Sequence, residues 1–326
     1  MTAQDALAHG GPDALGVPAH DFSTNANACG PCPQALAAVV AADAARYPDP
    51  AYVRLRARLA AFHGVAVARI HLAASASEFI ARMTAAVLCS GGRTVAVPRP
   101  GYADYARVAT AHGMALVPAR EADLVWLCDP GSPSGQAASA PPEAAAHAVL
   151  VIDRAYAPLR LAGTSLMLPQ AWQLWTPNKA LGLTGVRAAY AIAPDHPQAS
   201  ALGARLAALM PSWPIGAHGV ALLEQWTDAG VQRWLASSLE RLRAWKQQQI
   251  AVCESLGWQC LPGETPFFCA RPATADIPWL LDTLRAAHGI KLRDAGPLGM
   301  PGHVRLNALQ PPSQAALHAA LRTLQP

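Results

Sequence analysis

The chain has little charge and few lysines for its length. Asp, Glu, Lys and Arg make up 14% of the 326 residues, and lysine occurs only at positions 179, 246 and 291. The 25 Lys and Arg residues form no basic run and do not alternate with aromatic residues, so the net charge of +4 does not indicate nucleic-acid binding. A low charge content favours surface buried between subunits, and we expect a homodimer.

Long uninterrupted apolar stretches are also missing. A long run without a formal charge, residues 206–223, is broken by Pro211, Pro214 and Gly216, whereas a membrane span needs about 20 apolar residues. Residues 1–13 show no basic segment followed by an apolar one, so we expect no secretory signal. These features predict a cytoplasmic protein that contacts neither membrane nor nucleic acid.

The seven cysteines do not indicate a disulfide framework in a chain of this size, and no metal site is expected. Cys29-Gly30-Pro31-Cys32 has the spacing of a thioredoxin-type redox motif. That chemistry needs an apolar strand before the first cysteine and a helix that lowers its pKa, but residues 21–27 are polar and turn-like. We interpret the segment as a proline turn opening a helix at 34–45, and keep a redox site as the lesser alternative.

Residues 70–192 alternate between short apolar runs and longer helical patterns. The runs predicted as strands are 70–73, 94–98, 115–118, 124–128, 149–153, 172–176 and 188–193. Several are almost continuously apolar, as is typical of strands covered by helices on both faces. Helical patterns between them, for example at 78–88 and 102–112, predict an α/β/α domain of three layers with a mostly parallel seven-stranded sheet.

After Pro211 long helices replace this alternation. A helical stretch at 219–256 breaks near Gly230, and the elements that follow it are short strands around 266–270 and 303–308 and a last helix at 313–324. The Ala-rich residues 136–148 carry two prolines and are predicted as a loop leading into a helix.

The two patterns predict two domains. A large domain would span residues 41–218, and a smaller α+β domain would combine residues 1–40 with 219–326. In open α/β sheets, ligands bind beyond the carboxyl ends of the strands. Polar segments follow three predicted strands there, at 128–132, 153–156 and 176–179, so we expect the active site at that edge.

Lys179 is the lysine best placed for chemistry. Schiff-base formation needs a primary amine in a site that lowers its pKa. Lys246 stands among charged and amide residues of a predicted helix and is expected to be solvated, and Lys291 is expected to be exposed. Lys179 instead ends a strand and is followed by a glycine-rich turn and Arg187.

Residues 177–187, Pro-Asn-Lys-Ala-Leu-Gly-Leu-Thr-Gly-Val-Arg, resemble the cofactor-lysine segment of fold-type-I pyridoxal 5′-phosphate (PLP) enzymes near histidinol-phosphate aminotransferase. The resemblance covers nearly the whole chain, with matched segments in the family's order. It implies the aspartate aminotransferase fold, PLP as the cofactor, Lys179 as the lysine that binds it, and Arg187 as a ligand of the cofactor phosphate.

The resemblance also implies roles around the cofactor ring. Asp153 would pair with the pyridinium nitrogen, where a carboxylate keeps the ring protonated and able to accept electrons from Cα. Tyr156 would bond the ring oxygen, and Tyr102 would stack on the ring. Core packing would also explain either Tyr102 or Tyr47 alone. Further implied cofactor contacts are Ser75, Ala76, Ser77, Ser132, Thr176 and Asn178, with Tyr47 reaching the neighbouring subunit's cofactor phosphate. Lys179, Asp153 and Tyr156 are the expected catalytic residues.

Both ends of the chain resemble, more narrowly, the threonine-phosphate decarboxylases of the cobalamin pathway. The matched segments are His9-Gly10-Gly11, 21–25, 211–215 and 290–294. The resemblance implies that His9 and Gly10 help bind a substrate phosphate, that Asn25 and Arg293 are further substrate contacts, and that Arg305 clamps the α-carboxylate. A guanidinium fork suits a carboxylate, but surface ion pairing remains an alternative for both arginines.

Three departures from the family pattern bear on activity. Ser132 replaces an asparagine that bonds the ring oxygen, Arg154 replaces an acidic residue beside Asp153, and Asn178 replaces a serine. The first would leave Tyr156 alone at the ring oxygen or reach it through water, and the second would alter local charge.

The leading hypothesis is a PLP-dependent L-threonine-O-3-phosphate decarboxylase that makes (R)-1-amino-2-propanol O-2-phosphate for cobalamin biosynthesis. One alternative is an aminotransferase of the histidinol-phosphate type, and another is a PLP-binding protein with little catalysis. The same residues would serve decarboxylation and amino transfer, so the sequence leaves these two reactions open. Either substrate would be a small phosphorylated amino compound.

Overall fold

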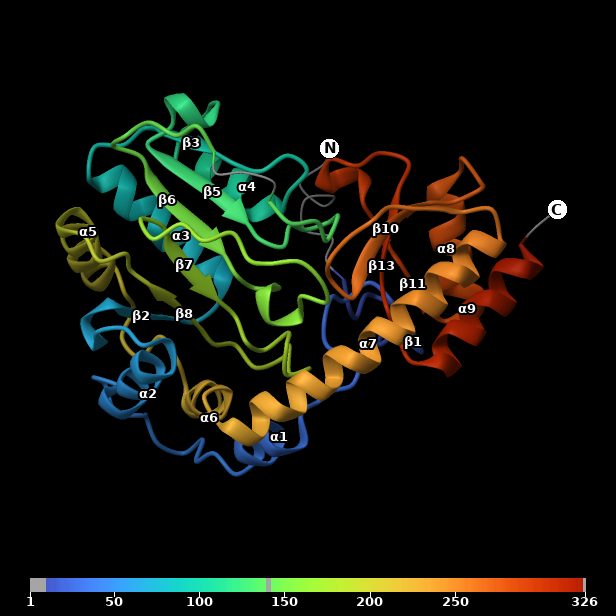
Figure 1. Cartoon of the computed structure of the whole chain (residues 1–326), viewed down its shortest axis with the longest axis horizontal. Coiled ribbons are helices and arrows are strands. Elements are labelled where there is room, and N and C mark those ends of the chain that lie inside the picture. Colours follow the sequence, from blue (N-terminus) through green and yellow to red (C-terminus); the bar gives the residue numbers. More distant parts are fainter. Residues whose placement is uncertain (1–9, 139–141, 325–326) are drawn as a thin grey trace.

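The computed structural model describes residues 10–138 and 142–324 of the chain. Figure 1 shows a large sheet with flanking helices and a smaller group of strands and helices, bridged by the long helix α7 (Ala229–Ser255). No helix in these two ranges is long and apolar enough to cross a membrane.

The large sheet has seven strands in the order β2-β8-β7-β6-β5-β3-β4. Their bounds are β2 (Ile70–Ala73), β3 (Thr94–Ala96), β4 (Ala115–Leu116), β5 (Leu124–Cys128), β6 (Val149–Asp153), β7 (Trp172–Trp175) and β8 (Ala189–Ile192). Strand β8 runs antiparallel to both β2 and β7, and the other pairs are parallel. The predicted mostly parallel seven-stranded sheet is confirmed.

Helices cover both faces of this sheet. One face carries α3 (Ala76–Cys89), α4 (Ala103–Ala111) and α5 (Pro197–Ala208), and the other carries α1 (Pro33–Val40), α2 (Val53–His63) and α6 (Ala217–Trp226). Side chains of a strand alternate between faces: Tyr190 packs with Leu59 and Leu222 on one side, and Ala191 packs with Phe79 on the other. The apolar strands therefore form the middle of three layers, as predicted.

A smaller antiparallel sheet of four strands lies at the other end of α7. Its strands, in spatial order, are β12 (Arg293–Asp294), β13 (Val304–Asn307), β10 (Phe267–Arg271) and β9 (Gln259–Cys260), and its helices are α8 (Ile277–His288) and α9 (Pro311–Thr323). Phe22, Phe268, Leu306 and Leu317 are buried together in its core.

The N-terminal residues divide between the two regions. Strand β1 (His20–Asp21) pairs in parallel with β11 (Ile290–Lys291), which joins it to the smaller region. Helix α1, in contrast, packs against α6 beside the large sheet. The division into residues 41–218 and 1–40 with 219–326 stays a prediction.

Two predicted helices differ from the structure. The helix expected at 34–45 ends at Val40, because Asp43 accepts from the backbone N–H of Ala45 at 2.9 Å and forms a turn instead. Residues 142–148 form no helix, since alanine offers little apolar surface to bury and Pro142 removes a backbone donor. Short 3-10 turns occur at Val67–Arg69, Ala119–Glu121, Ala157–Leu159 and Gly296–Leu298.

Candidate active site

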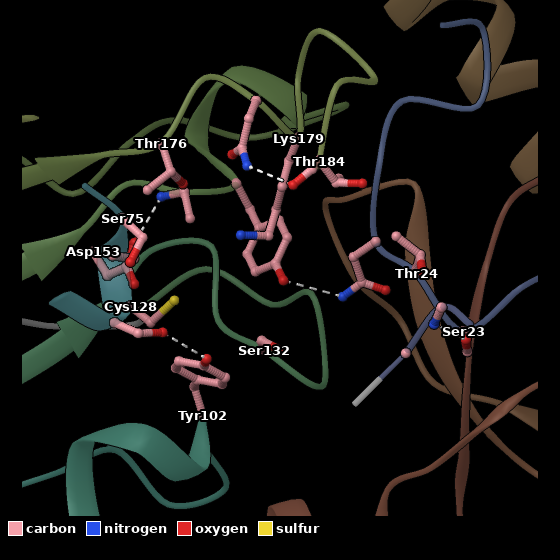
Figure 2. Close-up of a pocket in the computed structure, with 18 of the residues that line it drawn as sticks. Ser23, Thr24, Ser75, Tyr102, Cys128, Ser132, Asp153, Thr176, Lys179 and Thr184 are labelled. Carbon is pink, nitrogen blue, oxygen red and sulfur yellow. Dashed lines mark hydrogen bonds between the residues drawn. The ribbon is translucent and has the colours of Figure 1, made fainter. Parts of the chain in front are cut away.

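A cavity of about 370 Å³ opens at the carboxyl ends of β5, β6 and β7, opposite β13. The predicted site residues that line it are Gly10, Asn25, Ser75, Ala76, Ser77, Tyr102, Ser132, Asp153, Tyr156, Thr176, Asn178, Lys179, Arg187, Arg293 and Arg305. In Figure 2, Ser75, Cys128 and Asp153 gather on one side, Ser23 and Thr24 lie on the other, and Lys179 is between them. His9 lies outside the described residues, and Tyr47 does not line the cavity.

Asp153 ends β6 and is held by two hydrogen bonds. Its Oδ1 accepts from the backbone N–H of Ala155 and its Oδ2 accepts from the hydroxyl of Tyr105, both at 2.8 Å. Burial raises the pKa of Asp153, and the nearby charge of Lys179 opposes that shift. Tyr105 in turn stacks on Trp126, with ring centroids 5.1 Å apart. The carboxylate therefore has one defined orientation.

Sequence reasoning missed Tyr105. The available signal was its position three residues after Tyr102, which places both tyrosines on the same side of one helical turn. In the structure the two rings meet edge to face with centroids 5.7 Å apart. Gly11, Cys128 and Ala155 also line the cavity and belong to segments predicted for the site, whereas Pro12, Ser23, Thr24, Thr184, Ala188 and Leu298 were not singled out.

The three lysines have different surroundings. Lys179 lines the cavity with its Nζ 5.3 Å from the ring centroid of Tyr156. Lys246 is buried and donates to the carbonyl oxygen of Gly263 at 2.6 Å, so the expectation of a solvated side chain was wrong, and burial lowers its pKa to about 8. Lys291 was expected to be exposed but is largely covered and bonds Gly11. Lys179 is the only one of the three that faces the cavity.

The end of the cavity next to α3 is suited to an anion. Ser75 caps this helix by accepting from the backbone N–H of Glu78 at 3.1 Å, and Ala76 and Ser77 form its first turn. Backbone N–H groups there have no partner within the helix and carry the positive end of its dipole. Arg187 lines the same cavity and adds a full positive charge.

Asn178, which replaces the family's serine, stabilises the turn that leads to Arg187. Its Nδ2 donates to the carbonyl oxygens of Val186 at 3.3 Å and Thr184 at 3.5 Å. The amide donors are therefore committed to the backbone, and the side chain shapes the anion site through this turn.

Arg305 and Arg293 line the side of the cavity formed by β12 and β13. Arg305 is buried, and its two terminal nitrogens donate to the carbonyl oxygen of Ser23 at 2.7 Å and to Ser132 Oγ at 3.3 Å. Burial lowers the pKa of both guanidinium groups; the charge of Arg305 adds to the shift at Arg293, and acidic groups oppose the shift at each. Arg305 is buried and forms no ion pair with the described residues, so surface ion pairing does not explain it.

Arg154, which departs from the family pattern, pairs with a buried carboxylate. Arg154 turns away from Asp153, donates to Asp129 at 2.8 Å and also bonds the carbonyl oxygen of Leu166. Asp129 is fully buried and also pairs with Arg160 at 2.7 Å. Asp129 therefore pairs with Arg154, and the charge that shifts the pKa of Asp153 is that of Lys179. Ser132 contacts Arg305, and the nearest side-chain partner of the Tyr156 hydroxyl is Asn25 Nδ2 at 3.5 Å.

The Cys29–Cys32 motif has the opposite character to a redox site. Burial raises the pKa of Cys29, whose thiol donates to the carbonyl oxygen of Ser238 at 3.8 Å. Cys32 is buried at the start of α1. A reactive dithiol needs a lowered pKa, so the structure favours the proline turn.

Several buried polar atoms around the cavity lack a partner in the described part of the chain. They are Asn25 Oδ1, Thr176 Oγ1, Asn178 Oδ1 and Arg305 Nε. Such an atom costs about 1–3 kcal/mol unless something bonds it, which indicates a polar ligand. An amine, a buried carboxylate and a helix N-terminus in one cavity fit the aldehyde, ring nitrogen and phosphate of PLP. Fold and site together define the class of PLP enzymes with the aspartate aminotransferase fold.

The chain belongs to the aminotransferase class I and II family, whose model matches residues 18–324. It is 29% identical to a histidinol-phosphate aminotransferase of Symbiobacterium thermophilum, over 93% of this chain and 90% of that protein. The family membership confirms PLP as the expected cofactor.

Solved structures show the same fold. Histidinol-phosphate aminotransferase from Sinorhizobium meliloti, in complex with PLP, matches with a TM-score of 0.81 and 21% identity over 100% of this chain and 98% of that one. L-threonine-O-3-phosphate decarboxylase from Porphyromonas gingivalis matches with a TM-score of 0.75 and 19% identity over 93% and 98%. The predicted fold is confirmed, whereas the specific prediction of a decarboxylase is not.

Proposed function

We propose that the protein is a PLP-dependent aminotransferase of the histidinol-phosphate type, acting on a small amino compound that carries a phosphate. The observation that carries the proposal is the convergence of Lys179, Asp153 and the N-terminus of α3 on one cavity. The named relatives support amino transfer over the decarboxylase that the sequence alone favoured.

Each residue has a defined task in this proposal. Bound PLP supplies a ring that accepts electrons from the substrate Cα. Asp153 keeps a proton on the ring nitrogen, and its two hydrogen bonds hold the carboxylate in place. Lys179 would hold the cofactor and serve as the general base for the proton at Cα. Tyr102 would cover the ring, and Tyr156 would bond its oxygen.

The anionic groups would lie at opposite ends of the cavity. The cofactor phosphate would bind the first turn of α3 with Ser75, Ala76, Ser77 and Arg187, with Thr176 and Asn178 beside it. The substrate would bind Arg305 and Arg293 near Gly10 and Asn25, and His9 would add to this end of the site. Ser132 would orient Arg305.

A second candidate is decarboxylation of L-threonine O-3-phosphate. Two arginines, Arg293 and Arg305, face the substrate end of the cavity, and Gly10 and Gly11 line it too. Two guanidinium groups suit a substrate with both a carboxylate and a phosphate, which this amino acid has. The product would be the phosphorylated amino alcohol named above.

We also propose a homodimer in the cytoplasm. Tyr47 is 77% exposed, stacks on Trp213 with ring centroids 4.3 Å apart, and does not line the candidate active-site cavity of its own chain. Such an exposed aromatic pair suits a subunit contact through which Tyr47 reaches the partner's cofactor phosphate. All seven cysteines are free, as is usual in a reducing compartment.

The test offers the PLP-loaded protein two substrates in parallel. One reaction contains L-histidinol phosphate with 2-oxoglutarate, and the other contains L-threonine O-3-phosphate. Glutamate formed in the first reaction would support amino transfer. CO₂ with aminopropanol phosphate in the second reaction would instead support decarboxylation and contradict the proposal of amino transfer. A protein that binds PLP but gives neither product would contradict both activities and leave the hypothesis of a PLP-binding protein with little catalysis.

A further inference from the structure

Residues 10–16, here called the N-terminal strap, cross the substrate side of the cavity. Gly10, Gly11 and Pro12 line it. A Cβ at Gly10 would lie 2.3 Å from the carbonyl oxygen of Ser23, so only glycine allows this close approach. The backbone N–H of Gly11 donates to Ser23 Oγ at 2.9 Å.

Apolar burial does not hold the strap in place. Leu15 is 65% exposed and the following Val17 is 79% exposed, so neither side chain anchors it in a core. Glycines at positions 10, 11 and 16 give the backbone unusual freedom. Polar contacts must therefore supply the anchor.

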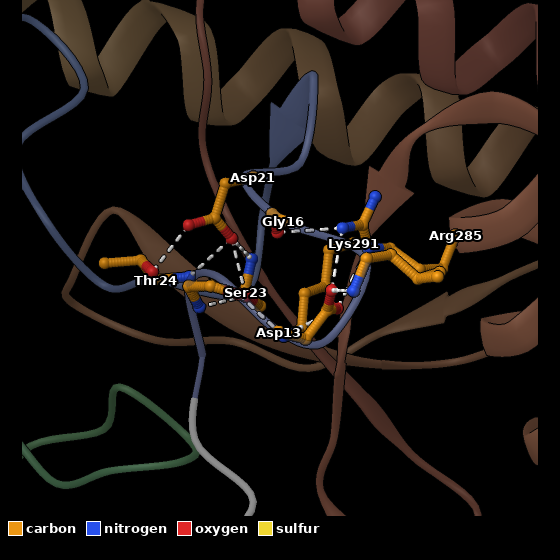
Figure 3. A network of polar contacts seen from close by, with 9 residues as sticks. Asp13, Gly16, Asp21, Ser23, Thr24, Arg285 and Lys291 are labelled. Atoms are coloured by element: carbon orange, nitrogen blue, oxygen red, sulfur yellow. Dashed lines mark hydrogen bonds and ion pairs between the residues drawn. The ribbon is translucent and has the colours of Figure 1, made fainter.

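Asp13 makes these contacts (Figure 3). Its two carboxylate oxygens accept from Arg285 on α8 at 2.7 and 2.9 Å, and one of them lies 3.1 Å from Lys291 Nζ on β11. The same two cations also bond the strap backbone: Lys291 donates to the carbonyl oxygen of Gly11 at 2.6 Å, and Arg285 donates to that of Gly16 at 2.9 Å. Bidentate geometry of this kind is the most specific form of ion pair.

The anchor is connected to Arg305 through Ser23. Ser23 Oγ accepts from Gly11, and its carbonyl oxygen accepts from Arg305 at 2.7 Å. Asp21 holds Ser23 by accepting from its hydroxyl at 2.5 Å and from its backbone N–H at 2.9 Å. A displacement of the strap would therefore change the environment of the arginine that faces the substrate.

We infer that Asp13 is a positioning residue that keeps the strap closed against Arg285 and Lys291, and thereby sets the substrate side of the cavity for an anionic group. It acts through Gly11 and Ser23 and touches neither cofactor nor substrate. The link to substrate binding rests on the proposed function, whereas the closure of the strap does not.

The experiment compares Asp13→Ala with a matched control in the PLP-loaded protein. The control is Glu224→Ala, because Glu224 also forms a bidentate pair with an arginine, Arg54, at 2.6 and 2.8 Å, but far from the strap in sequence and outside the cavity lining. Asp13→Asn keeps the shape of the side chain but removes its charge, so it separates the contribution of the charge from that of the shape. Measurements are amide hydrogen exchange of residues 10–16, KM and kcat for the amino substrate, and the dissociation constant of PLP.

We expect faster exchange of residues 10–16 and a KM raised about fivefold in Asp13→Ala, with kcat within about twofold and PLP affinity unchanged. Asp13→Asn should show most of this effect and Glu224→Ala none. Unchanged exchange of residues 10–16 and an unchanged KM in Asp13→Ala would overturn the inference. A loss of PLP affinity as large as the rise in KM would also overturn it. If the wild type turns over neither substrate, the proposed function fails, and hydrogen exchange still decides whether Asp13 closes the strap.

Discussion

The two halves of the cavity are built in different ways. The cofactor half takes Asp153, Thr176 and Lys179 from consecutive strand ends of the large sheet, and Tyr105 from a helix packed on it. The substrate half joins the strap to β12 and β13, from opposite ends of the chain. A packed core orients the first half, whereas the strap in the second is held by polar contacts, of which those to Arg285 are exposed.

This difference predicts where substitutions act. Changes in the cofactor half should alter cofactor binding or kcat, because the groups that touch the ring are fixed by the core. Changes in the substrate half should alter KM, because they affect how well an anionic substrate is held.

Lys179→Ala should have the largest effect. Removal of the amine should abolish the visible absorbance of lysine-bound PLP and lower turnover by about 10³-fold or more, because both the attachment and the proton transfer are lost. Absorbance spectra and single-turnover assays measure this. Lys246→Met, which removes the other buried amine, should keep the absorbance band; a band that survives in Lys179→Ala would exclude Lys179 as the cofactor lysine.

Arg305→Ala should have the next largest effect, on the substrate half alone. Loss of a buried charged hydrogen bond to a substrate anion, either the phosphate of the amino substrate or a carboxylate of 2-oxoglutarate, corresponds to about 2–3 kcal/mol, or roughly a 30- to 150-fold rise in KM. Steady-state kinetics with PLP-saturated protein measure it. Arg305→Lys should recover only part of the affinity, since it lacks the planar fork, and an unchanged KM in Arg305→Ala would rule out the clamp.

Tyr105→Phe should affect the cofactor half alone. It removes the hydroxyl that holds Asp153 Oδ2, and a buried bond to a charged group is worth about 1.5 kcal/mol, so PLP should bind about tenfold more weakly. Fluorescence titration with PLP checks this. Tyr190→Phe removes a comparable buried hydroxyl, bonded to His63 at 2.7 Å outside the cavity, and should leave PLP affinity unchanged.

A change of pH is expected to have the smallest effect, measured as the protection of the strap from hydrogen exchange. The bidentate bond to Arg285 holds the pKa of Asp13 well below its ordinary value of 3.8. A lowered pKa means that the contribution of Asp13 is complete above pH 3.8 and is lost only in stronger acid. Hydrogen exchange of residues 10–16, corrected for the intrinsic rate, should therefore not change between pH 5 and 9. Protection that declines from pH 7 to 5 would show that another group holds the strap.

Much of the fold could be predicted from the sequence because the buried strands are continuously apolar. Strands β5 and β6, in the middle of the sheet, match their predicted bounds. Strand β4 is shorter than predicted because it lies at the sheet edge, where both its residues are exposed and pairing stops early. The local pattern of apolar residues therefore predicts the bounds of a strand where both of its faces are buried.

Only those residues of the site that lie in recognisable motifs could be predicted from the sequence. Asp153 ends β6, and Lys179 and Arg187 lie in the recognisable segment between β7 and β8. Pairing between distant residues leaves no local signal: nothing in the sequence shows that Arg154 is neutralised by Asp129, 25 positions earlier. The burial of Lys246 is similarly set by the β9–β10 connection that packs over its helix.

The most direct test of the division between the two halves is a double-mutant cycle with Tyr105→Phe and Asp13→Ala. These residues share no hydrogen-bond partner, so their effects should be independent. We predict that the double variant shows the weakened PLP binding of Tyr105→Phe and the raised KM of Asp13→Ala, each within about twofold of the single variant. A coupling above that limit in either quantity would contradict the separation of a core-held cofactor half from a strap-held substrate half.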